Sequence, residues 1–322
     1  MTIIIQILNA IGDGFLAQSA IMSLINEHKK HRVVLIIPSD LADTVFKYLP
    51  VEKIILEIDR NYFYPYYNFH NNLQTLSSSF NSVDVLYCLT KFYPLPDYDL
   101  KIIDTLRPKK IYQFNKKEII ELKHSSQKYH NFIKGKIALD QFNTLRIPII
   151  PSDFEMEITK QLAISMNDKP FVVFHTDTAE PKQWNLEGWN HILHNLKDRN
   201  DIILIGRPKK EVIKLFHSFG AKIVKSDWHL SCLFIKYAAY FVGIDSCFAH
   251  IADSYGKKGL IIWGNSTEKS EYDKLLRQNE FGYLSNNIQV IFNDISTNEI
   301  PCNLYDALLI SCNCMQIKGS VS

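Results

Sequence analysis

Short runs of β-branched and aliphatic residues alternate along the chain with longer amphipathic stretches. Between the first two runs, Gly14–Glu27 carries apolar residues at helical spacing, and Asp40–Leu49 repeats that pattern after the second run. In the first half, five runs have the length and composition of buried strands: Thr2–Leu8, Arg32–Ile37, Lys53–Ile58, Val83–Leu89 and Lys110–Phe114. Strands that alternate with helices predict a parallel, doubly wound α/β sheet.

The alternation lapses near residue 150 and then starts again. Two prolines within Ile147–Asp153 indicate a linker. Beyond the linker, the strand pattern returns at Phe171–His175, Ile202–Ile205, Ala221–Val224, Tyr240–Ile244 and Gly259–Trp263. The sequence therefore predicts two domains of one architecture, residues 1–150 and 151–322, with a ligand site in a cleft between them.

Composition narrows the class of protein. The 322 residues are 46% hydrophobic and 22% charged, which is enough apolar material for a sizeable core. The formal net charge of +2 is too even for binding nucleic acid by bulk charge, so we expect no nucleic-acid partner. No apolar run approaches the roughly 20 residues of a membrane-spanning helix. The first residues lack a basic segment typical of a secretory signal, and six scattered cysteines fit reduced thiols, so we expect a cytoplasmic location.

The end of the first predicted strand carries the first candidate site. Asn9-Ala10-Ile11-Gly12-Asp13-Gly14 opens a helix, and glycines at such a junction let backbone amides approach a ligand. The third glycine of the dinucleotide fingerprint is missing, and the acid after the second strand, Asp40, belongs to a helix start, which argues against a nicotinamide site. Asp13 has two interpretations: an N-cap of the helix, or a general base at the carboxyl edge of the sheet.

A second candidate site follows the strand Phe171–His175. A polar loop leads to Lys182 and then to a helix that Asn185 would cap, with Trp189 on its buried face. A lysine on such a loop suits a phosphate ligand, although a solvated loop lysine is the commoner case.

A third candidate site follows the strand that ends at Ile244. We expect a helix to begin at once, with Asp245 or Ser246 as its cap. Its first-turn amides would be available to a diphosphate. These amides lie near Ser246, Cys247 and Phe248. His250, on the same helix, is by residue type more often a packed core residue than a catalytic one.

Three further segments keep two interpretations each. The aromatic stretch Asn61–His70 is either a packed loop or helix start, or a platform for an acceptor. The basic residues are either a solvated face or a contact with an anionic, membrane-borne acceptor: Arg107, Lys109, Lys110, Lys116, Lys117, Lys123 and Lys128. The spacing of Cys302, Cys312 and Cys314 matches no standard zinc pattern, so we expect no metal there.

Five blocks of residues, in order along nearly the whole chain, resemble one family. They are Asn9–Asp13, His175 through Lys182-Gln183-Trp184 to Trp189, Val242–Ala252, Trp263–Thr267 and Cys314–Ile317. Together they resemble glycosyltransferase family 9, the ADP-heptose:lipopolysaccharide heptosyltransferases. Cys247 stands where the family has a glycine, and Asn185 where it has a proline.

The resemblance implies a GT-B fold, that is, two Rossmann-like domains facing a central cleft. It implies an inverting transfer without metal or other cofactor, in which the N-terminal domain binds the acceptor and the C-terminal domain the nucleotide-sugar donor. Asp13 would be the base and Lys182 the cation beside the donor phosphates. The resemblance assigns the donor site to Thr178, Asp245, Ser246, Cys247, Phe248 and His250.

The implied reaction moves heptose or a similar sugar from an ADP-heptose-like donor to a bacterial surface glycan such as lipopolysaccharide core. The implied partners are this donor and a glycan or glycolipid acceptor, with peripheral contact at the cytoplasmic face of the inner membrane. Two alternatives use the same architecture: a nucleotide-sugar 2-epimerase, which needs no acceptor, and a catalytically silent protein that binds nucleotide sugars.

Overall fold

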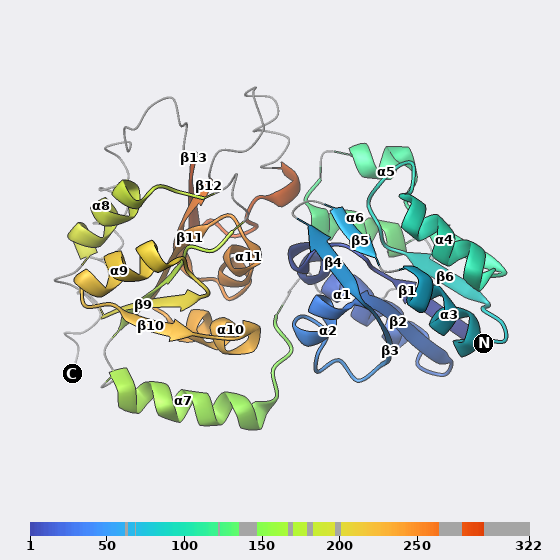
Figure 1. The fold of residues 1–322 in the computed structure, drawn as a ribbon, viewed down its shortest axis with the longest axis horizontal. Coiled ribbons are helices and arrows are strands. Elements are labelled where there is room, and N and C mark those ends of the chain that lie inside the picture. The colour runs from blue at the N-terminus through green and yellow to red at the C-terminus, as the bar shows by residue number, and fades with distance from the viewer. Residues whose placement is uncertain are drawn as a thin grey trace. The chain divides into compact units, whose positions relative to one another are not determined.

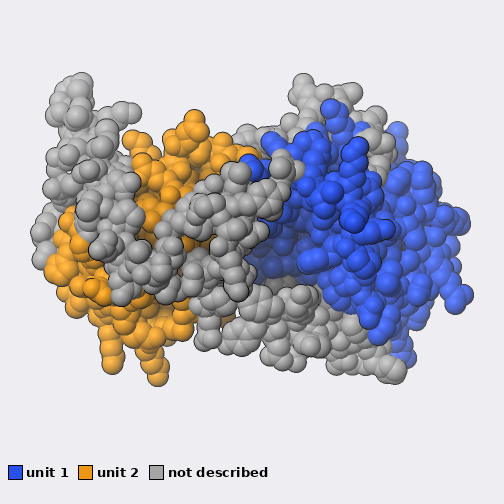
Figure 2. Space-filling view, turned by 90° about the horizontal axis from the view of Figure 1, so that it is seen from above, with its two compact units in different colours: residues 1–149, 275–282 blue, residues 150–274, 283–322 orange. Residues whose placement is uncertain are grey.

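The chain folds into two compact units in its computed structural model, which describes residues 1–61, 64–67, 69–121, 123–134, 147–166, 170–178, 183–196, 201–263 and 279–292 (Figure 1). Unit 1 contains residues 1–149 and 275–282, and unit 2 contains residues 150–274 and 283–322 (Figure 2). The short segment 275–282 thus returns to unit 1 although it lies deep in the second half of the sequence.

Unit 1 is built on a five-stranded parallel sheet. Its strands, in spatial order, are β3 (Glu52–Leu56), β2 (Arg32–Pro38), β1 (Thr2–Gln6), β6 (Val85–Cys88) and β7 (Lys110–Gln113). Its helices are α1 (Ile11–Glu27), α2 (Ser39–Asp43), α3 (Phe69–Ser79), α4 (Asp97–Leu106), α5 (Lys116–Ile120) and α6 (Ser125–Lys134). The five predicted strands of this half are confirmed, with small changes at their ends.

The central strand β1 is buried on both faces. Ile3, Ile4 and Ile5 are all fully buried although successive side chains of a strand point to opposite faces. Ile4 belongs to a cluster that includes Leu76 of α3 and Ile102 of α4. A continuous apolar run in place of alternation is therefore the pattern of a parallel strand covered on both sides.

Two local predictions in unit 1 were wrong or incomplete. The helix expected over Asp40–Leu49 ends at Asp43, and turns follow it. The Thr44 hydroxyl donates to the Asp40 carbonyl, so the side chain competes for the backbone acceptor of the next helical turn. Val45 and Phe46 are nevertheless fully buried, which explains the misleading apolar pattern.

The aromatic stretch at Asn61–His70 contains a hairpin that the sequence analysis missed. Strand β4 (Ile58–Asn61) pairs antiparallel with β5 (Tyr64–Tyr67), and α3 begins at Phe69. Tyrosine favours extended backbone, so the run of aromatic residues forms a strand here. The side chains of this stretch, and with them the acceptor-platform hypothesis, lie outside the described residues.

Unit 2 repeats the same design with six parallel strands. In spatial order they are β10 (Lys222–Lys225), β9 (Asp201–Gly206), β8 (Phe171–His175), β11 (Tyr240–Ile244), β12 (Lys258–Trp263) and β13 (Ile288–Phe292). Its helices are α7 (Ser152–Met166), α8 (Leu186–Leu196), α9 (Lys210–Ser218), α10 (Trp228–Tyr237) and α11 (Cys247–Ser254). The predicted strands of this half are confirmed as well.

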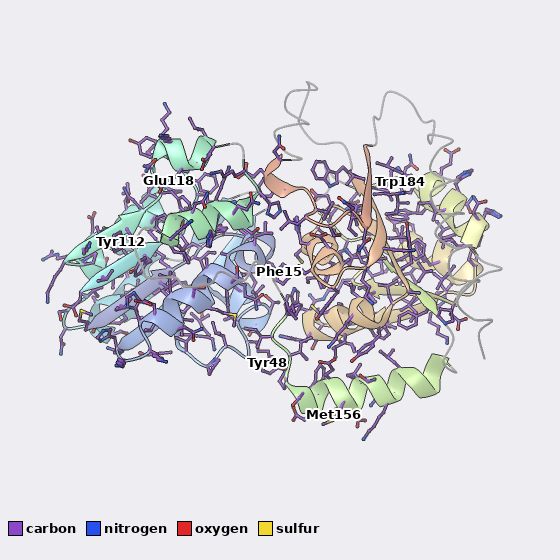
Figure 3. All side chains as sticks on the ribbon, turned by 180° about the vertical axis from the view of Figure 1, so that it is seen from behind. Phe15, Tyr48, Tyr112, Glu118, Met156 and Trp184 are labelled. Carbon is purple, nitrogen blue, oxygen red and sulfur yellow. The ribbon has the colours of Figure 1, made fainter. Side chains whose placement is uncertain are left out.

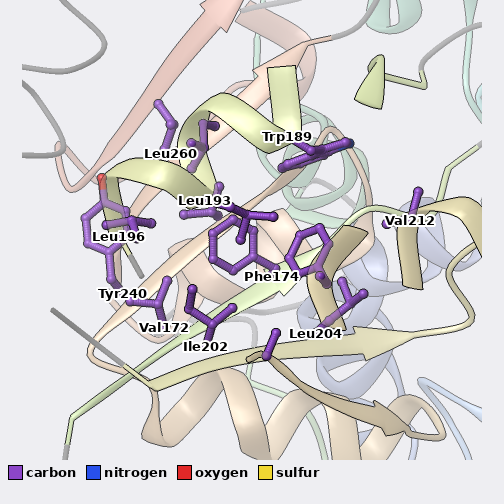
Figure 4. Close-up of a cluster of buried hydrophobic side chains, with 14 of the residues drawn as sticks. Val172, Phe174, Trp189, Leu193, Leu196, Ile202, Leu204, Val212, Tyr240 and Leu260 are labelled. Carbon is purple, nitrogen blue, oxygen red and sulfur yellow. The ribbon is translucent and has the colours of Figure 1, made fainter. Parts of the chain in front are cut away.

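The core of unit 2 lies between its sheet and helices α8 and α9. Phe174 of β8 packs edge-on against Trp189 of α8 and Phe216 of α9, with ring centroids 6.2 and 5.1 Å apart (Figure 4). On the opposite face, Phe171 meets Phe234 of α10. Helices on both faces of a parallel sheet confirm the α/β, doubly wound class in each unit. Among the described residues, no helix combines the length and apolar character needed to cross a bilayer.

Candidate functional site

Each of the two parallel sheets has one point where its strand order reverses, and the candidate residues that the structure describes lie at the carboxyl edges of these points. In unit 1 the order reverses between β1 and β6, and in unit 2 between β8 and β11. At such a point the two neighbouring loops leave in opposite directions and open a crevice that binds ligands in doubly wound sheets. The two edges are described one after the other.

Asp13 lies in the first turn of α1 and is not its cap. The N-cap position belongs to Ala10, and both Gly12 and Gly14 are helical. The N-cap interpretation of Asp13 was therefore wrong. A carboxylate in the first turn still interacts favourably with the positive end of the helix dipole. The Asp13 side chain is 23% exposed, so solvent reaches its carboxylate.

A lysine that the sequence analysis did not single out contacts this carboxylate. Lys91, on the loop after β6, places its Nζ 3.2 Å from Asp13 Oδ1. The same Nζ donates to Ser125 Oγ at 2.7 Å and lies 3.6 Å from Glu280 Oε1. The sequence signal was available: Lys91 follows the predicted strand Val83–Leu89, whose carboxyl end neighbours that of the first strand.

A buried carboxyl lies between β1 and β6 below this edge. Asp99 Oδ1 accepts hydrogen bonds from Gln6 Nε2 and from Thr90 Oγ1, the latter at 3.0 Å, and the Cys88 thiol lies 3.7 Å away. Asp99 Oδ2 is buried without a hydrogen-bond partner among the described residues. Burial raises the pKa of Asp99 to about 6, because the charged form loses water that these donors replace only in part.

At the edge of unit 2, His175 ends strand β8 as a buried, neutral imidazole. Burial lowers its pKa to about 3, so it carries no charge at physiological pH. Its Nδ1 lies 3.3 Å from Ser246 Oγ, and its ring contacts that of Phe248 with centroids 4.6 Å apart. His175 therefore joins the end of β8 to the start of α11.

The segment between β11 and α11 is held at both sides. The Asp245 amide donates to Ile262 O at 3.2 Å, and Thr178 Oγ1 donates to Asp245 O at 3.4 Å. Ser246 is the N-cap, as one of the two predicted alternatives had it, but its side chain makes no capping hydrogen bond. Its hydroxyl faces His175 in place of the helix. Hence the first-turn amides of α11 receive no capping hydrogen bond from that side chain.

Helix α11 itself begins at Cys247. Desolvation raises the pKa of the Cys247 thiol to about 12, so the side chain that replaces the family's glycine is a neutral thiol. His250 lies one turn further along, is buried, and has its ring 5.3 Å from that of Tyr283. Asp253 accepts from the amides of Leu284 and Ser285, both at 2.9 Å. These contacts fix α11 against residues 283–285.

The loop between β8 and α8 is described in part, and Lys182 lies outside the described residues. Asn185 does cap α8, since its Oδ1 accepts from the Gly188 amide at 2.7 Å. Trp184, which is labelled in Figure 3, packs edge-on against Trp189 with ring centroids 4.9 Å apart, and a Cβ at Gly188 would overlap its indole. Gln183 Nε2 donates a hydrogen bond to Thr178 O at 3.2 Å.

The candidate residues of unit 2 that the structure describes thus come together at one edge, and Asp13 lies at the corresponding edge of unit 1. The sequence analysis grouped Lys128 with basic residues expected at the surface, and this was wrong for Lys128. It is buried, and its Nζ lies 3.0 Å from Glu280 Oε1. The remaining described members, apart from the half-buried Lys123, are exposed. Within the described ranges no three His, Cys, Asp or Glu side chains are grouped as metal ligands would be, and the cysteines at 302, 312 and 314 fall outside those ranges.

Comparison with known proteins gives consistent results. Residues 123–279 match the model of glycosyltransferase family 9 (heptosyltransferase). Lipooligosaccharide heptosyltransferase 2 of Campylobacter jejuni subsp. jejuni serotype O:2 is 23% identical over 277 residues, which cover 82% of this chain and 81% of that protein.

Solved structures agree at the level of the fold. A family 9 glycosyltransferase from Veillonella parvula has a TM-score of 0.69 at 12% identity, over 96% of this chain and 90% of that one. The E. coli heptosyltransferase WaaC with ADP has a TM-score of 0.68 at 13% identity, over 97% and 100% of the two chains. At these identities the likeness establishes the GT-B fold.

Proposed function

We propose that this chain is a glycosyltransferase of the heptosyltransferase-like family 9 type, which the family match over residues 123–279 and the 23% identity to a lipooligosaccharide heptosyltransferase support. In this proposal it moves heptose or a similar sugar from a nucleoside diphosphate sugar such as ADP-heptose to a bacterial lipooligosaccharide or lipopolysaccharide core. One observation carries the proposal: each parallel sheet has a suitable group at the edge where its strand order reverses. In unit 1 this group is the partly exposed carboxylate Asp13, and in unit 2 it is the helix start Ser246–Phe248. Glycosyl transfer needs both a proton acceptor and a binding site for the diphosphate of the donor.

The donor diphosphate binds at the amino end of α11. Backbone amides in the first turn of a helix have no partner within the helix, and the helix dipole favours an anion there. Ser246, Cys247 and Phe248 supply these amides. Lys182 lies beside the phosphates as a cation, Thr178 and Asp245 bind the donor, and His250 supports the turn. The hydrogen bond from Thr178 to Asp245 O supports placing both at one ligand.

The charge on the departing nucleoside diphosphate is stabilised without a metal. The dipole of α11 and the charge assigned to Lys182 stabilise the leaving oxygens, and preorganised groups of this kind are typically the largest electrostatic contribution to catalysis. The neutral state of His175 fits this arrangement, since it orients Ser246 without adding charge that would vary with pH.

Asp13 removes the proton from the acceptor hydroxyl. An alcohol is a poor nucleophile at pH 7, and a carboxylate in hydrogen-bond reach takes its proton as the new bond forms. The acceptor oxygen attacks the anomeric carbon opposite the leaving diphosphate, so one bond to this carbon forms as the other breaks. The configuration at the anomeric carbon is inverted.

The acceptor side belongs to unit 1. Five basic side chains of this unit, at Arg107, Lys109, Lys110, Lys116 and Lys117, are exposed. We assign them to contact with an anionic, membrane-borne acceptor at the cytoplasmic face of the inner membrane, without insertion. Lys109 already pairs with Asp84 at 2.7 Å, so its contribution is reduced.

A transfer assay tests the proposal. Purified protein is incubated with a lipooligosaccharide core that lacks heptose and with ADP-heptose or another nucleoside diphosphate sugar. The mass of the product is then measured by mass spectrometry. One added sugar in excess EDTA is the expected result. Abolition by EDTA that manganese restores would contradict the metal-independent mechanism.

Donor-only incubations separate the alternatives. Epimerised donor in the absence of acceptor would point to an epimerase. Nucleotide binding with no product from any donor and acceptor would point to a silent binding protein. Binding without turnover is measurable by thermal shift, since a ligand at about 100 times its dissociation constant adds about 2.7 kcal/mol of stability.

A further inference from the structure

The ammonium of Lys91 is held beside the proposed base, and the reaction described above gives it no role. Its side chain is 6% exposed, whereas that of Asp13 is 23% exposed. The contact joins Nζ to Oδ1 of Asp13 at 3.2 Å. The buried partner is thus the cation, and the carboxylate lies at the surface end of the pair.

Several groups from different parts of unit 1 hold the Lys91 ammonium in place. Ser125 of α6 accepts its hydrogen bond at 2.7 Å. The rings of Tyr129 and Phe281 each have their centroids 5.1 Å from Nζ, within the range of cation–π attraction. A lysine side chain has four rotatable bonds and is normally mobile. Here its end is fixed by α6 and by the segment 279–282.

Lys91 has a second carboxylate partner besides Asp13, namely Glu280. Glu280 Oε1 lies 3.6 Å from Lys91 and 3.0 Å from Lys128. A buried ammonium without a carboxylate partner costs several kcal/mol, so a lysine with one partner would oppose neutralisation of that partner. Lys91 contacts two carboxylates, those of Asp13 and Glu280, so it does not depend on Asp13 alone for a partner.

We infer that Lys91 is a positioning residue for Asp13: it holds the carboxylate through Oδ1, so that Oδ2 is directed to the acceptor hydroxyl. The inference rests on the proposed function, because it assigns Asp13 the part of base. Lys91 does not touch the reacting atoms. It restricts the rotation of a short side chain at a helix end, where misplacement of a reacting group by about 1 Å is enough to cost 10²-fold in rate.

The test compares Lys91→Met with Lys91→Arg. Methionine keeps much of the stem but removes the charge, so we expect kcat to fall by about 10- to 100-fold with KM for the donor unchanged, because the donor binds in unit 2. Arginine keeps a cation at the site and is expected to recover part of the loss. Lys128→Met is the matched control: it removes an equally buried lysine that shares Glu280, and turnover per folded molecule is expected to stay at the wild-type level.

A double variant decides whether Lys91 acts through Asp13. In an Asp13→Asn background, Lys91→Met is expected to cause no further loss of kcat, whereas independent roles would multiply the two losses. Multiplied losses, or a Lys91→Met protein with wild-type kcat, would overturn the inference.

Failure of the proposed function has a different signature. If the wild-type protein transfers no sugar, thermal midpoints still measure the contact between Lys91 and Asp13. The four proteins compared are the wild type, Lys91→Met, Asp13→Asn and the double variant. A double variant whose midpoint falls less than the sum of the two single shifts keeps Lys91 as the residue that holds Asp13. Additive shifts would overturn the inference independently of activity.

Discussion

Asp99 illustrates at the scale of one residue how burial sets protonation. Its carboxyl is fully buried, accepts hydrogen bonds through one oxygen and leaves the other without a partner among the described residues. A protonated carboxyl suits this surrounding better than a carboxylate, and the pKa of about 6 expresses that preference. The unfolded chain has the ordinary value near 3.9.

This difference predicts that Asp99 weakens unit 1 as the pH rises. Between pH 4 and 6 the unfolded chain loses the Asp99 proton while the folded chain keeps it, so stability falls through this window by on the order of 3 kcal/mol. Asp99→Asn keeps the acceptor oxygen and adds a donor, so it is expected to remove this loss. The thermal midpoint of Asp99→Asn relative to wild type should therefore rise from pH 4 to pH 7.

Asp97→Asn, an exposed carboxylate in the same helical turn, is the control. Its midpoint relative to wild type is expected not to rise over the same range, because the carboxylate that it removes lies in the first turn of the helix, where the dipole favours a negative charge. A flat Asp99→Asn difference would show that the Asp99 carboxyl is as ionised in the folded protein as in the unfolded chain.

At the scale of elements, the start of α8 depends on a glycine that a helix would not otherwise favour. A Cβ at Gly188 would overlap the indole of Trp184, and that indole packs on Trp189. In an open helix, alanine is about 1 kcal/mol better than glycine. Here Gly188→Ala is expected to lower the free energy of unfolding by about 1–3 kcal/mol, because overpacking must displace Trp184.

Thermal midpoints and near-ultraviolet circular dichroism of the tryptophans measure this change. Gly14→Ala is the comparison, since its added methyl meets only the flexible end of Leu41. We expect a smaller loss there. A Gly188→Ala protein as stable as wild type would mean that Trp184 does not pack on this helix.

These elements also show what the sequence could predict. Strands such as β1 and β11 are buried on both faces, so their apolar runs are readable without knowledge of neighbours. The early end of α2 depends on one threonine hydroxyl that competes for a backbone carbonyl, and the hairpin β4–β5 on aromatic residues that fit several structures. Local pattern does not distinguish such cases.

In the candidate site, too, some residues could be found from local sequence pattern and others could not. The cap Ser246 follows from a strand end and a helix start, which pattern reveals. The ion pair of Lys91 with Asp13 joins residues 78 positions apart, and Glu280 joins them only because segment 275–282 returns to unit 1. Pairings of this kind depend on topology, and the sequence analysis could have reached Lys91 only through the predicted order of the strands.

At the scale of the whole molecule, the proposed reaction uses groups from two parallel sheets, one in each unit. The proposed base, Asp13, lies at the edge of unit 1 where the strand order reverses, and the helix start proposed to bind the donor diphosphate lies at the corresponding edge of unit 2. A change at the first edge is therefore expected to alter turnover and leave nucleotide affinity unchanged. Lys182→Ala is expected to reduce turnover roughly 10²-fold or more, since it removes the charge proposed to stabilise the leaving group.

The most direct test of the central claim is the turnover of Asp13→Asn at saturating donor and acceptor. Asparagine keeps the shape of the side chain and cannot accept the proton. We predict a folded protein that binds donor as wild type does and loses about 10²- to 10⁴-fold in kcat. An Asp13→Asn protein with wild-type turnover would contradict the account, because Asp13 would then be only the partner of Lys91.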